Sequence, residues 1–407
     1  MNQNSNYSDR MTILYPVNIR FPMERANSIQ IVNTCRALAE NGVMVYLLVR
    51  RMSNRKTDEM LKFYGLTPHK NLKIIKVPVI NYDNHEFIWN KSFYVSVVLY
   101  IFYFLLFKKI DVFFLRDLGL AKLFIKLKKI FGYKIVYETH IISYIVSENQ
   151  HLLFPMANPV GESKIAQIKA KESFVYKNSD AMFVLTNLLK HRIIDEFSVD
   201  GDKINILPDG VNMELFDSSD SDKRDGLVYI GQLYPWKGVD TLIEAMQFID
   251  SKLTVIGGVP FEDDLIRLRK KSEDLNLDNK ITFTGFMKPE KISQYLKKAK
   301  ISVIPLPDNV IARDFTSPLK LFESMAAKTA VVASDLPSIR EVIRDGENGL
   351  LFEPGNPKSL ADKIKLILKD EELYKCISEK SYSESQKYCW NARAKSIIFV
   401  LRKLKIC

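Results

Sequence analysis

The chain has 407 residues, enough for two or three domains, which excludes a peptide hormone, a disulfide-built scaffold or a lone binding module. Hydrophobic residues make up 47% and charged residues 26%, the balance of a soluble globular protein. The net charge of +11 is uneven, because residues 50–134 carry 17 basic and 6 acidic side chains. We expect a positive face on the N-terminal half, suited to anionic lipid, nucleic acid or a phosphorylated substrate, or else a plain solvated lysine-rich surface.

Short β-branched runs alternate with helical patterns along the first half of the chain. The strands expected there are residues 11–16, 43–49, 72–80, 111–115, 134–138, 181–185 and 203–208. Strands separated by single helices form βαβ units and therefore a parallel sheet covered on both faces. We predict an N-terminal Rossmann-like domain over residues 1–215.

One apolar run in this half, residues 93–107, has 15 residues and ends at Lys108 and Lys109. It is shorter than the roughly 20 residues that span a bilayer, so we expect a buried or interfacial element. The N-terminus lacks the apolar core of a signal peptide, and the four cysteines form no CxxC pair and no metal spacing. These features predict a cytoplasmic protein, with peripheral contact to the inner face of the plasma membrane.

The second half repeats the alternation more regularly after a polar, aperiodic linker at residues 216–226. Its expected strands are residues 227–231, 252–257, 281–285, 301–305, 330–334 and 349–353. We predict a second Rossmann-like domain over residues 227–385 and a C-terminal helix, residues 386–407, that packs back on the first domain. The predicted fold class is α/β, with two doubly wound domains facing each other across a cleft, where such sheets bind ligands at the carboxyl ends of their strands.

The most informative segment is the helix start at residues 313–327. Ser317 is a natural N-cap and Pro318 a natural first helical residue, so the free N–H groups of the first turn form a seat for phosphate. Glu323, six residues past this cap, is placed to accept hydrogen bonds from two ribose hydroxyls of a nucleotide, although a solvated helical glutamate is the plainer interpretation.

Two glycine-containing loops follow neighbouring strands of the same domain. Lys237 lies in the first loop, residues 231–238, where its ammonium can neutralise a diphosphate. Gly257 and Gly258 follow the next strand and let the backbone approach a ligand closely.

Together these segments resemble the retaining glycosyltransferases of the family 4 (group 1) type, which have the GT-B fold. The resemblance covers nearly the whole chain. In the first half it includes RANSIQIVNTCRALAENGVMVYLLV, IVYETH and KINILPDGVNMELF. In the second half it includes IGQLYPWKGVDTLIEAM and SPLKLFESMAAKTAVVASDLPSIREVIRDGENGLLFEPGNP.

The resemblance implies catalytic roles for Glu323 on the donor ribose, Lys237 on the donor diphosphate and His140 near the transferred sugar. Two positions depart from the family pattern. Gln232 replaces an arginine of the diphosphate clamp, and Phe315 replaces a glutamate that contacts the hexose. Arg313 and Asp314 are candidate substitutes, and the remaining donor-binding candidates are Gly231, Gln232, Gly257, Gly258, Thr316, Ser317, Leu319 and Lys320.

On the acceptor side, the loop before the first helix carries the candidates Glu24, Arg25, Asn27 and Ser28, with a surface loop as the alternative. The literal Asp-x-Asp pattern at residues 220–222 lies in the linker and carries little weight. No metal and no cofactor is expected, because the family pattern needs none.

The leading hypothesis is a retaining transferase that moves a hexose from a nucleoside diphosphate sugar to a lipid-linked or saccharide acceptor in cell-envelope glycan or glycolipid synthesis. One alternative is a nucleotide-sugar or glycan-binding protein with little turnover, which the departures at Gln232 and Phe315 leave open. Another is a nucleotide-sugar epimerase on the same fold. A nucleic-acid partner is not expected, because the basic region has no recognition helix or stacking platform.

Overall fold

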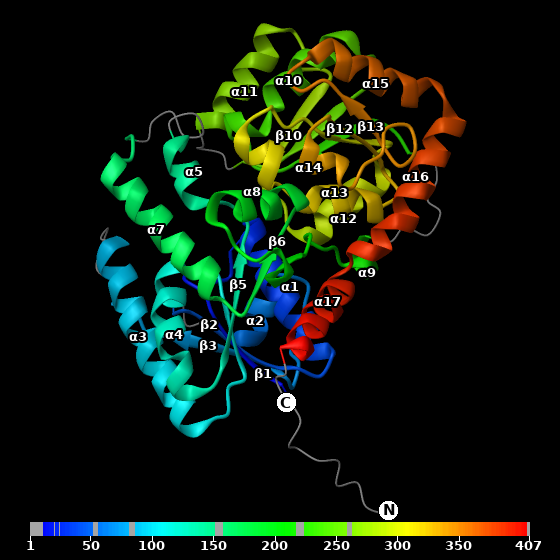
Figure 1. Ribbon diagram of the computed structural model, residues 1–407. Helices are drawn as coiled ribbons and strands as arrows, with labels where there is room; N and C mark the ends of the chain where they lie inside the picture. The colour runs from blue at the N-terminus through cyan, green and yellow to red at the C-terminus, as the bar shows by residue number, and fades with distance from the viewer. Residues whose placement is uncertain are drawn as a thin grey trace, which may run out of the picture.

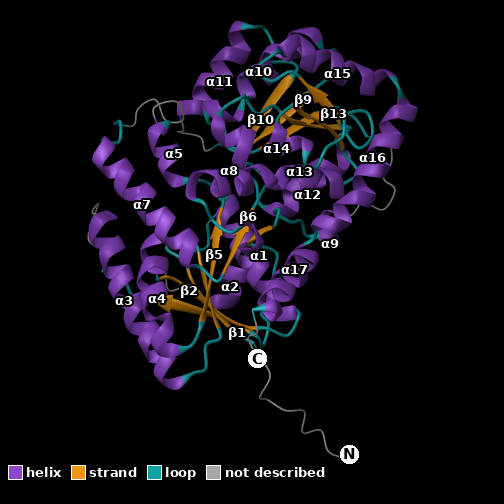
Figure 2. Ribbon diagram, in the orientation of Figure 1, coloured by secondary structure: helices purple, strands orange, loops and turns teal. Residues whose placement is uncertain are grey.

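The computed structural model describes residues 11–19, 21–23, 25–51, 56–80, 86–150, 158–216, 224–258 and 263–404, and the side chains of residues 86–89 are not described. Two parallel sheets, each covered by helices on both faces, lie one above the other in the view of Figures 1 and 2. The predicted α/β class with two doubly wound domains is therefore confirmed.

The first sheet has the strand order β3-β2-β1-β4-β5-β6-β7. Each of its strands overlaps a segment that the sequence predicts. The bounds are β1 Thr12–Pro16, β2 Met44–Arg50, β3 Leu72–Val77, β4 Val112–Leu115, β5 Lys134–Thr139, β6 Ala181–Val184 and β7 Ile204–Ile206, with small differences at the ends. The helices of this half are α1 Ala26–Glu40, α2 Thr57–Lys62, α3 Glu86–Phe107, α4 Leu118–Phe131, α5 Ser143–Glu148, α7 Glu162–Asn178, α8 Asn187–Phe197 and α9 Met213–Phe216.

The second sheet has the order β10-β9-β8-β11-β12-β13. Its strands are β8 Leu227–Ile230, β9 Leu253–Ile256, β10 Ile281–Gly285, β11 Ile301–Ile304, β12 Ala330–Ser334 and β13 Leu350–Phe352. Its helices are α10 Val239–Ala245, α11 Asp263–Asp274, α12 Pro289–Lys298, α13 Leu319–Ala326, α14 Pro337–Arg340, α15 Pro357–Lys369 and α16 Glu371–Ser385. The predicted linker falls mostly outside the described residues, because residues 217–223 are among those not described.

Local sequence signals explain several helix ends. The side chain of Asp117 accepts a hydrogen bond from the Leu120 N–H and begins α4, which ends at Gly132 in the left-handed conformation with φ 75°. Asn356 caps α15 in the same way, and Pro357 occupies its first turn, where a missing N–H costs nothing.

The chain returns to the first domain after α16. Helix α17, Trp390–Lys403, lies against α1 at the lower right of Figure 1. Its apolar face, which includes Trp390, Ala394, Ile397 and Leu401, is part of the core formed by α1 and the first sheet. The last helix therefore ties the second domain to the first.

Helix α3 has two apolar faces. Phe93, Val97, Ile101 and Phe104 are buried in the core of the first domain. The outer face is exposed and includes Val95, Leu99, Tyr103, Leu106 and Phe107. Within the described ranges this is one helix with a stretch, Asn90–Phe107, that is long and apolar enough to cross a membrane, and 22% of that stretch is buried.

Candidate active site

A cavity of about 360 Å³ lies between the two domains, at the carboxyl ends of strands from both sheets. His140 and Asp209 line it from the first domain, and Lys237, Lys320 and Glu323 line it from the second. A cavity with a largely apolar wall and a few charged side chains, where strands of two doubly wound sheets end, is the place where this class of fold binds its ligands.

Backbone forms much of the second domain's wall. Gly231 and Gln232 follow β8, and Gly257 and Gly258 follow β9, and all of them line the cavity. Gly257 has φ 149°, and a Cβ at this residue would lie 1.8 Å from the carbonyl oxygen of Gly231. A side chain at residue 257 would therefore push the two loops apart, so this wall keeps its shape only with glycine.

Lys237 is a partly buried cation on the cavity wall. Its Nζ lies 3.9 Å from the centre of the Trp236 ring, and burial lowers the pKa of Lys237 to about 8. The pKa falls because burial removes water from the ammonium. An anionic ligand would stabilise the charged form here.

Helix α13 supplies an ion pair on the cavity wall. The Nζ of Lys320 lies 2.8 Å from Oε2 of Glu323, whose side chain is 9% exposed. The ion pair orients the Glu323 carboxylate while leaving it on the cavity wall. Thr316, Ser317 and Leu319 line the cavity at the start of the same helix.

The helix start differs from the prediction in one detail. Helix α13 begins at Leu319, and Pro318, with φ −77° and ψ 122°, occupies the cap position. The expected N-cap at Ser317 is wrong, because the Ser317 hydroxyl instead accepts a hydrogen bond from the Asp209 N–H, at 3.1 Å, across the cleft. Ser317 therefore joins the two domains.

Arg313 and Asp314 do not line the cavity. Arg313 is exposed, with its Nη1 3.8 Å from Oδ1 of Asp308. Oδ2 of Asp314 lies 2.6 Å from the Arg192 guanidinium on α8, and the Asp314 carbonyl accepts a hydrogen bond from Thr186. The carboxylate that sequence places near the sugar is thus used in an ion pair between the domains.

Phe315 lies beside this ion pair and is 1% exposed. It packs into the core of the first domain, in one cluster with Leu115, Ile142 and Val184. Phe315 therefore anchors the second domain to the first, which explains why an apolar residue occupies this position.

Replacing Phe315 with alanine should lower the free energy of unfolding by about 3 to 5 kcal/mol, because the change leaves a cavity where the two domains meet. Urea denaturation of the variant beside Phe248→Ala, a control at an exposed phenylalanine, measures this. Equal midpoints for the two variants would show that Phe315 is not an anchor.

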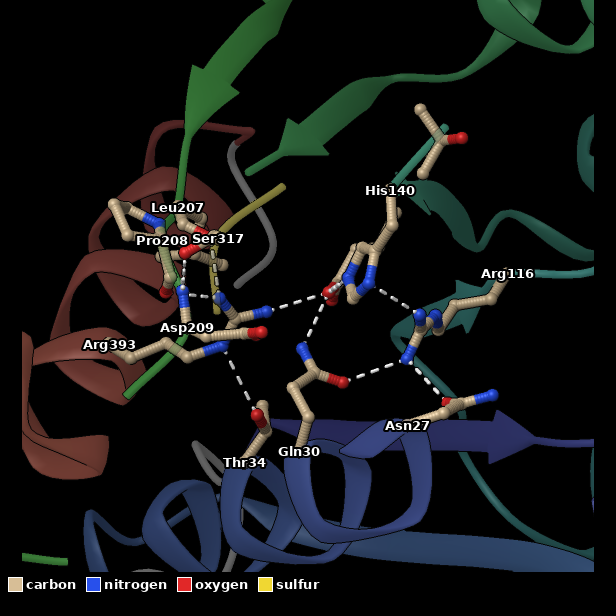
Figure 3. Close-up of polar contacts among 12 residues, drawn as sticks. Asn27, Gln30, Thr34, Arg116, His140, Leu207, Pro208, Asp209, Ser317 and Arg393 are labelled. Carbon is tan, nitrogen blue, oxygen red and sulfur yellow. Dashed lines mark hydrogen bonds and ion pairs between the residues drawn. The ribbon is translucent and has the colours of Figure 1, made fainter. Parts of the chain in front are cut away.

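His140 belongs to a polar cluster at the end of β5 (Figure 3). Its Nε2 lies 2.5 Å from Oε1 of Glu138, and its Nδ1 lies 2.9 Å from the Arg116 guanidinium. Because arginine only donates, Nδ1 must accept and Nε2 must carry the proton. Burial, followed by the charge of Arg116, lowers the pKa of His140 to about 4, so the imidazole is neutral at physiological pH.

Glu138 is the centre of this cluster. Arg393 of α17 and Gln30 of α1 each donate to its Oε1 at 2.7 Å. Arg393 also donates to the carbonyls of Leu207 and Pro208, at 2.6 and 2.7 Å. Burial raises the pKa of Glu138, but the charge of Arg393, the hydrogen bond from His140 and the charge of Arg116 outweigh it and hold that pKa well below its usual range.

Sequence reasoning missed several members of the cluster. Glu138 lies near the end of β5, and Arg116 directly follows β4. Their positions at the carboxyl ends of strands could have marked them as site residues. Arg393 gave no such signal, because a single arginine in an amphipathic helix is normally solvated. The missed residues are Gln30, Arg116, Glu138, Asp209 and Arg393.

The described acceptor-side candidates lie next to the cavity but do not line it. Glu24 is outside the described residues. Arg25 is exposed, Ser28 is buried, and Asn27 accepts a hydrogen bond from Arg116 at 3.0 Å. The cavity wall next to them is formed by Ala26, Ile29 and Asn33.

No group of three His, Cys, Asp or Glu side chains that could hold a metal ion occurs in the part of the chain that the structure describes. The Asp-x-Asp pattern at residues 220–222 lies outside that part.

Comparison with known proteins shows similarity over the second domain. Residues 213–384 match the family described as glycosyl transferases group 1. An uncharacterized glycosyltransferase of Methanocaldococcus jannaschii is 28% identical over 228 residues, which are 55% of this chain and 60% of the relative. The D-inositol 3-phosphate glycosyltransferase of Acidothermus cellulolyticus is 25% identical over 252 residues, 57% of this chain and 55% of the relative. The matched region thus spans somewhat over half the length of these relatives.

Solved structures match the whole fold. Sucrose-phosphate synthase from Thermosynechococcus elongatus superposes with a TM-score of 0.76 at 19% identity, covering 97% of this chain and 99% of that one. Anabaena HepE, solved in complex with UDP and glucose, has a TM-score of 0.72 at 15% identity, covering 97% and 100%. The two-domain arrangement is the GT-B fold, as predicted.

Proposed function

We propose that the protein is a retaining glycosyltransferase acting on nucleoside diphosphate sugars, because residues 213–384 match the group 1 glycosyltransferase family. It moves a hexose-type sugar to a lipid-linked or saccharide acceptor in cell-envelope glycan or glycolipid synthesis. The observation that carries this proposal is the convergence of Lys237, Lys320 and Glu323 with the start of α13 on one interdomain cavity.

Transfer of a sugar builds negative charge on the departing diphosphate and positive charge on the anomeric carbon. Lys237, Lys320 and the free N–H groups at the start of α13 meet the diphosphate charge. Lys320 takes the place that sequence reasoning gave to Arg313, because Lys320 lies on the cavity wall and Arg313 does not. With Gln232 neutral, these groups form the cationic side of the site.

The Glu323 carboxylate accepts hydrogen bonds from the donor ribose, in the orientation that Lys320 imposes. His140 faces the transferred sugar from the opposite wall as a neutral imidazole. Because both of its ring nitrogens are bonded within the protein, it is not the base that removes the acceptor proton. The leaving phosphate oxygen takes that proton during attack on the same face of the sugar, so the anomeric configuration is retained.

A thermal-shift panel of UDP-, GDP- and ADP-sugars tests the donor class. A donor at 100 times its dissociation constant should add about 2.7 kcal/mol of stability. UDP-glucose is the first probe, because HepE binds UDP and glucose in the same fold. Unchanged melting temperatures across the whole panel would contradict the proposal.

We also propose that the protein binds anionic membranes peripherally. The outer face of α3 is apolar, and Lys122, Lys126 and Lys129 are exposed on α4. The two helices lie side by side at the lower left of Figure 1, and the rings of Phe102 on α3 and Phe131 on α4 are in contact. Lys128 is excluded from this surface, because its Nζ lies 3.2 Å from Asp180.

Reversing the charge of Lys122, Lys126 and Lys129 to glutamate should weaken binding to phosphatidylserine vesicles by about 3 kcal/mol or more, at roughly 1 kcal/mol for each lysine. Vesicle co-sedimentation at low and high salt measures it. The control reverses three exposed lysines of the second domain, Lys270, Lys291 and Lys375. Equal losses in the two variants would place the membrane contact elsewhere.

A further inference from the structure

The loop after β7 places a carboxyl group on the cavity wall that the mechanism above does not use. Asp209 lines the cavity and is 7% exposed. Its Oδ1 is fully buried and has no hydrogen-bond partner among the described residues. Buried carboxyl oxygens are normally hydrogen-bonded, so a missing partner needs an explanation.

The loop that carries Asp209 is held on three sides. Arg393 donates to the carbonyls of Leu207 and Pro208 immediately before it. The Val211 N–H donates to the Tyr388 carbonyl, at 2.8 Å, immediately after it. The Asp209 N–H donates to Ser317 on the other domain. Since the backbone is fixed on both sides, the side chain cannot move far to find a partner within the protein.

Packing on Gly210 tightens the loop further. A Cβ at this residue would lie 2.9 Å from the Trp390 ring and 3.0 Å from the Tyr388 carbonyl. The loop and the start of α17 are thus in close contact, and this contact fixes the position of the preceding residue.

The nearest cations are committed to other groups. Arg393 bonds Glu138, two carbonyls and Thr34. Arg116 bonds Asn27, Gln30 and His140. Figure 3 shows Asp209 beside the Arg393 guanidinium, pointing toward the side where Gln30 and His140 lie.

We infer that Asp209 is a substrate-contacting residue whose carboxylate accepts a hydrogen bond from a hydroxyl group of the saccharide bound in the cleft. This inference rests on the proposed function and extends it by one residue. A sugar hydroxyl would donate the hydrogen bond that Oδ1 lacks within the described part of the protein. The contacts of the loop with α17 and Ser317 hold the Asp209 carboxyl group in place before the sugar binds.

The ionisation of Asp209 gives the inference a second readout. Burial and the charge of Glu138 raise the pKa of Asp209, against the opposing charges of Arg393 and Arg116, to about 7. The titratable groups that share its cavity are Tyr64 and the neutral His140 from the first domain, and Tyr229, Lys237, Lys320 and Glu323 from the second. The ionised form of Asp209, which accepts the stronger charge-assisted hydrogen bond, therefore predominates above about pH 7 and is lost as the pH falls through that value.

The hydroxyl belongs either to the donor sugar or to the acceptor, and kinetics separates the two. Asp209→Ala should lower kcat/KM for transfer by about 10- to 150-fold, the range for a hydrogen bond to a charged group. If the donor sugar supplies the hydroxyl, donor hydrolysis without acceptor falls equally, and affinity for the donor falls while affinity for the free nucleoside diphosphate does not. If the acceptor supplies it, donor hydrolysis is unchanged and the KM for acceptor rises.

The pH profile distinguishes contact from mere structural support. In the wild type, kcat/KM should rise through pH 7, and Asp209→Asn should remove that limb while keeping more activity than Asp209→Ala. Asp202→Asn, at an exposed aspartate of the same domain, is the control and should match the wild type.

Three results discriminate the possibilities. If the wild type is active and the Asp209 variants keep its activity and pH profile, the inference is wrong and the proposed function stands. A variant that melts early and loses nucleoside diphosphate affinity with an unchanged pH limb shows a structural role and also overturns it. A wild type that turns over no nucleotide sugar refutes the proposed function, and the inference falls with it.

Discussion

Replacing Arg393 with methionine should lower the free energy of unfolding by about 3 to 5 kcal/mol, the usual cost of leaving one partner of a buried ion pair unpaired. The change leaves the Glu138 carboxylate, 1% exposed, without its closest cation. It also removes the donor from the carbonyls of Leu207 and Pro208.

Urea denaturation at pH 7 followed by far-UV circular dichroism measures the loss. Arg393→Met combined with Glu138→Gln is the matched control, because a neutral amide is less costly to bury than a carboxylate, and part of the stability should return. A double variant as unstable as the single one would show that the ion pair is not the source of the effect.

The same pair sets a pH dependence. The folded pKa of Glu138 lies below its unfolded value, so its contribution to stability is present above the unfolded pKa and is lost as the pH falls through the folded one. The stability gap between wild type and Arg393→Met should therefore narrow in acid.

Removing the Lys237 ammonium should have the largest effect on turnover. Lys237→Ala should lower kcat by about 10²- to 10³-fold, the range seen when one group that stabilises developing negative charge is deleted. Donor affinity should change less, because the diphosphate gains negative charge as it leaves the sugar. Steady-state kinetics with saturating donor measures the effect, with Lys252→Ala, at an exposed lysine near the same sheet, as the control.

The pKa of Lys237 gives this prediction a signature. Because burial lowers that pKa to about 8, the charged form is lost as the pH rises through 8, and kcat/KM should fall there in the wild type. An arginine at this position keeps its charge to much higher pH. In Lys237→Arg the fall of kcat/KM should therefore shift to higher pH, even if the rate is lower. An unmoved limb would assign the alkaline loss to another group.

The elements of the fold were predictable because their signals are local. Apolar runs of four to seven residues, such as β8 and β12, are separated by single helical patterns, and this alternation specifies a parallel sheet. The glycine loops and the start of α13 follow the carboxyl ends of those strands, so their place on the cleft wall followed from the topology.

The pairing of side chains across the cleft was not predictable from local signals. Asp314 had the right chemistry for a sugar contact, but its partner Arg192 lies on the other domain. Ser317 had the right type for a helix cap, but the Asp209 N–H reaches it from the first domain. Arg393 lies 255 positions along the chain from Glu138, and only the return of α17 to the first domain brings them together.

Helix α3 shows a different limit. Its apolar residues predict burial or an interface, and hydropathy alone does not separate the two. In the structure, one face of the helix is buried in the core and the other face is exposed. Exposure is a tertiary property, and it is what turns the run into a candidate membrane surface.

The central claim is that the interdomain cavity transfers a sugar from a nucleoside diphosphate with retention of configuration. Time-resolved ¹H NMR of the purified protein with each donor that shifts its melting temperature, with and without membrane-extracted acceptor, tests this claim directly. We expect loss of the donor anomeric signal, release of the nucleoside diphosphate and a product whose anomeric coupling constant matches that of the donor, with the rate sharply reduced in Lys237→Ala. A product of inverted configuration, or a wild-type rate no greater than that of Lys237→Ala, would contradict it.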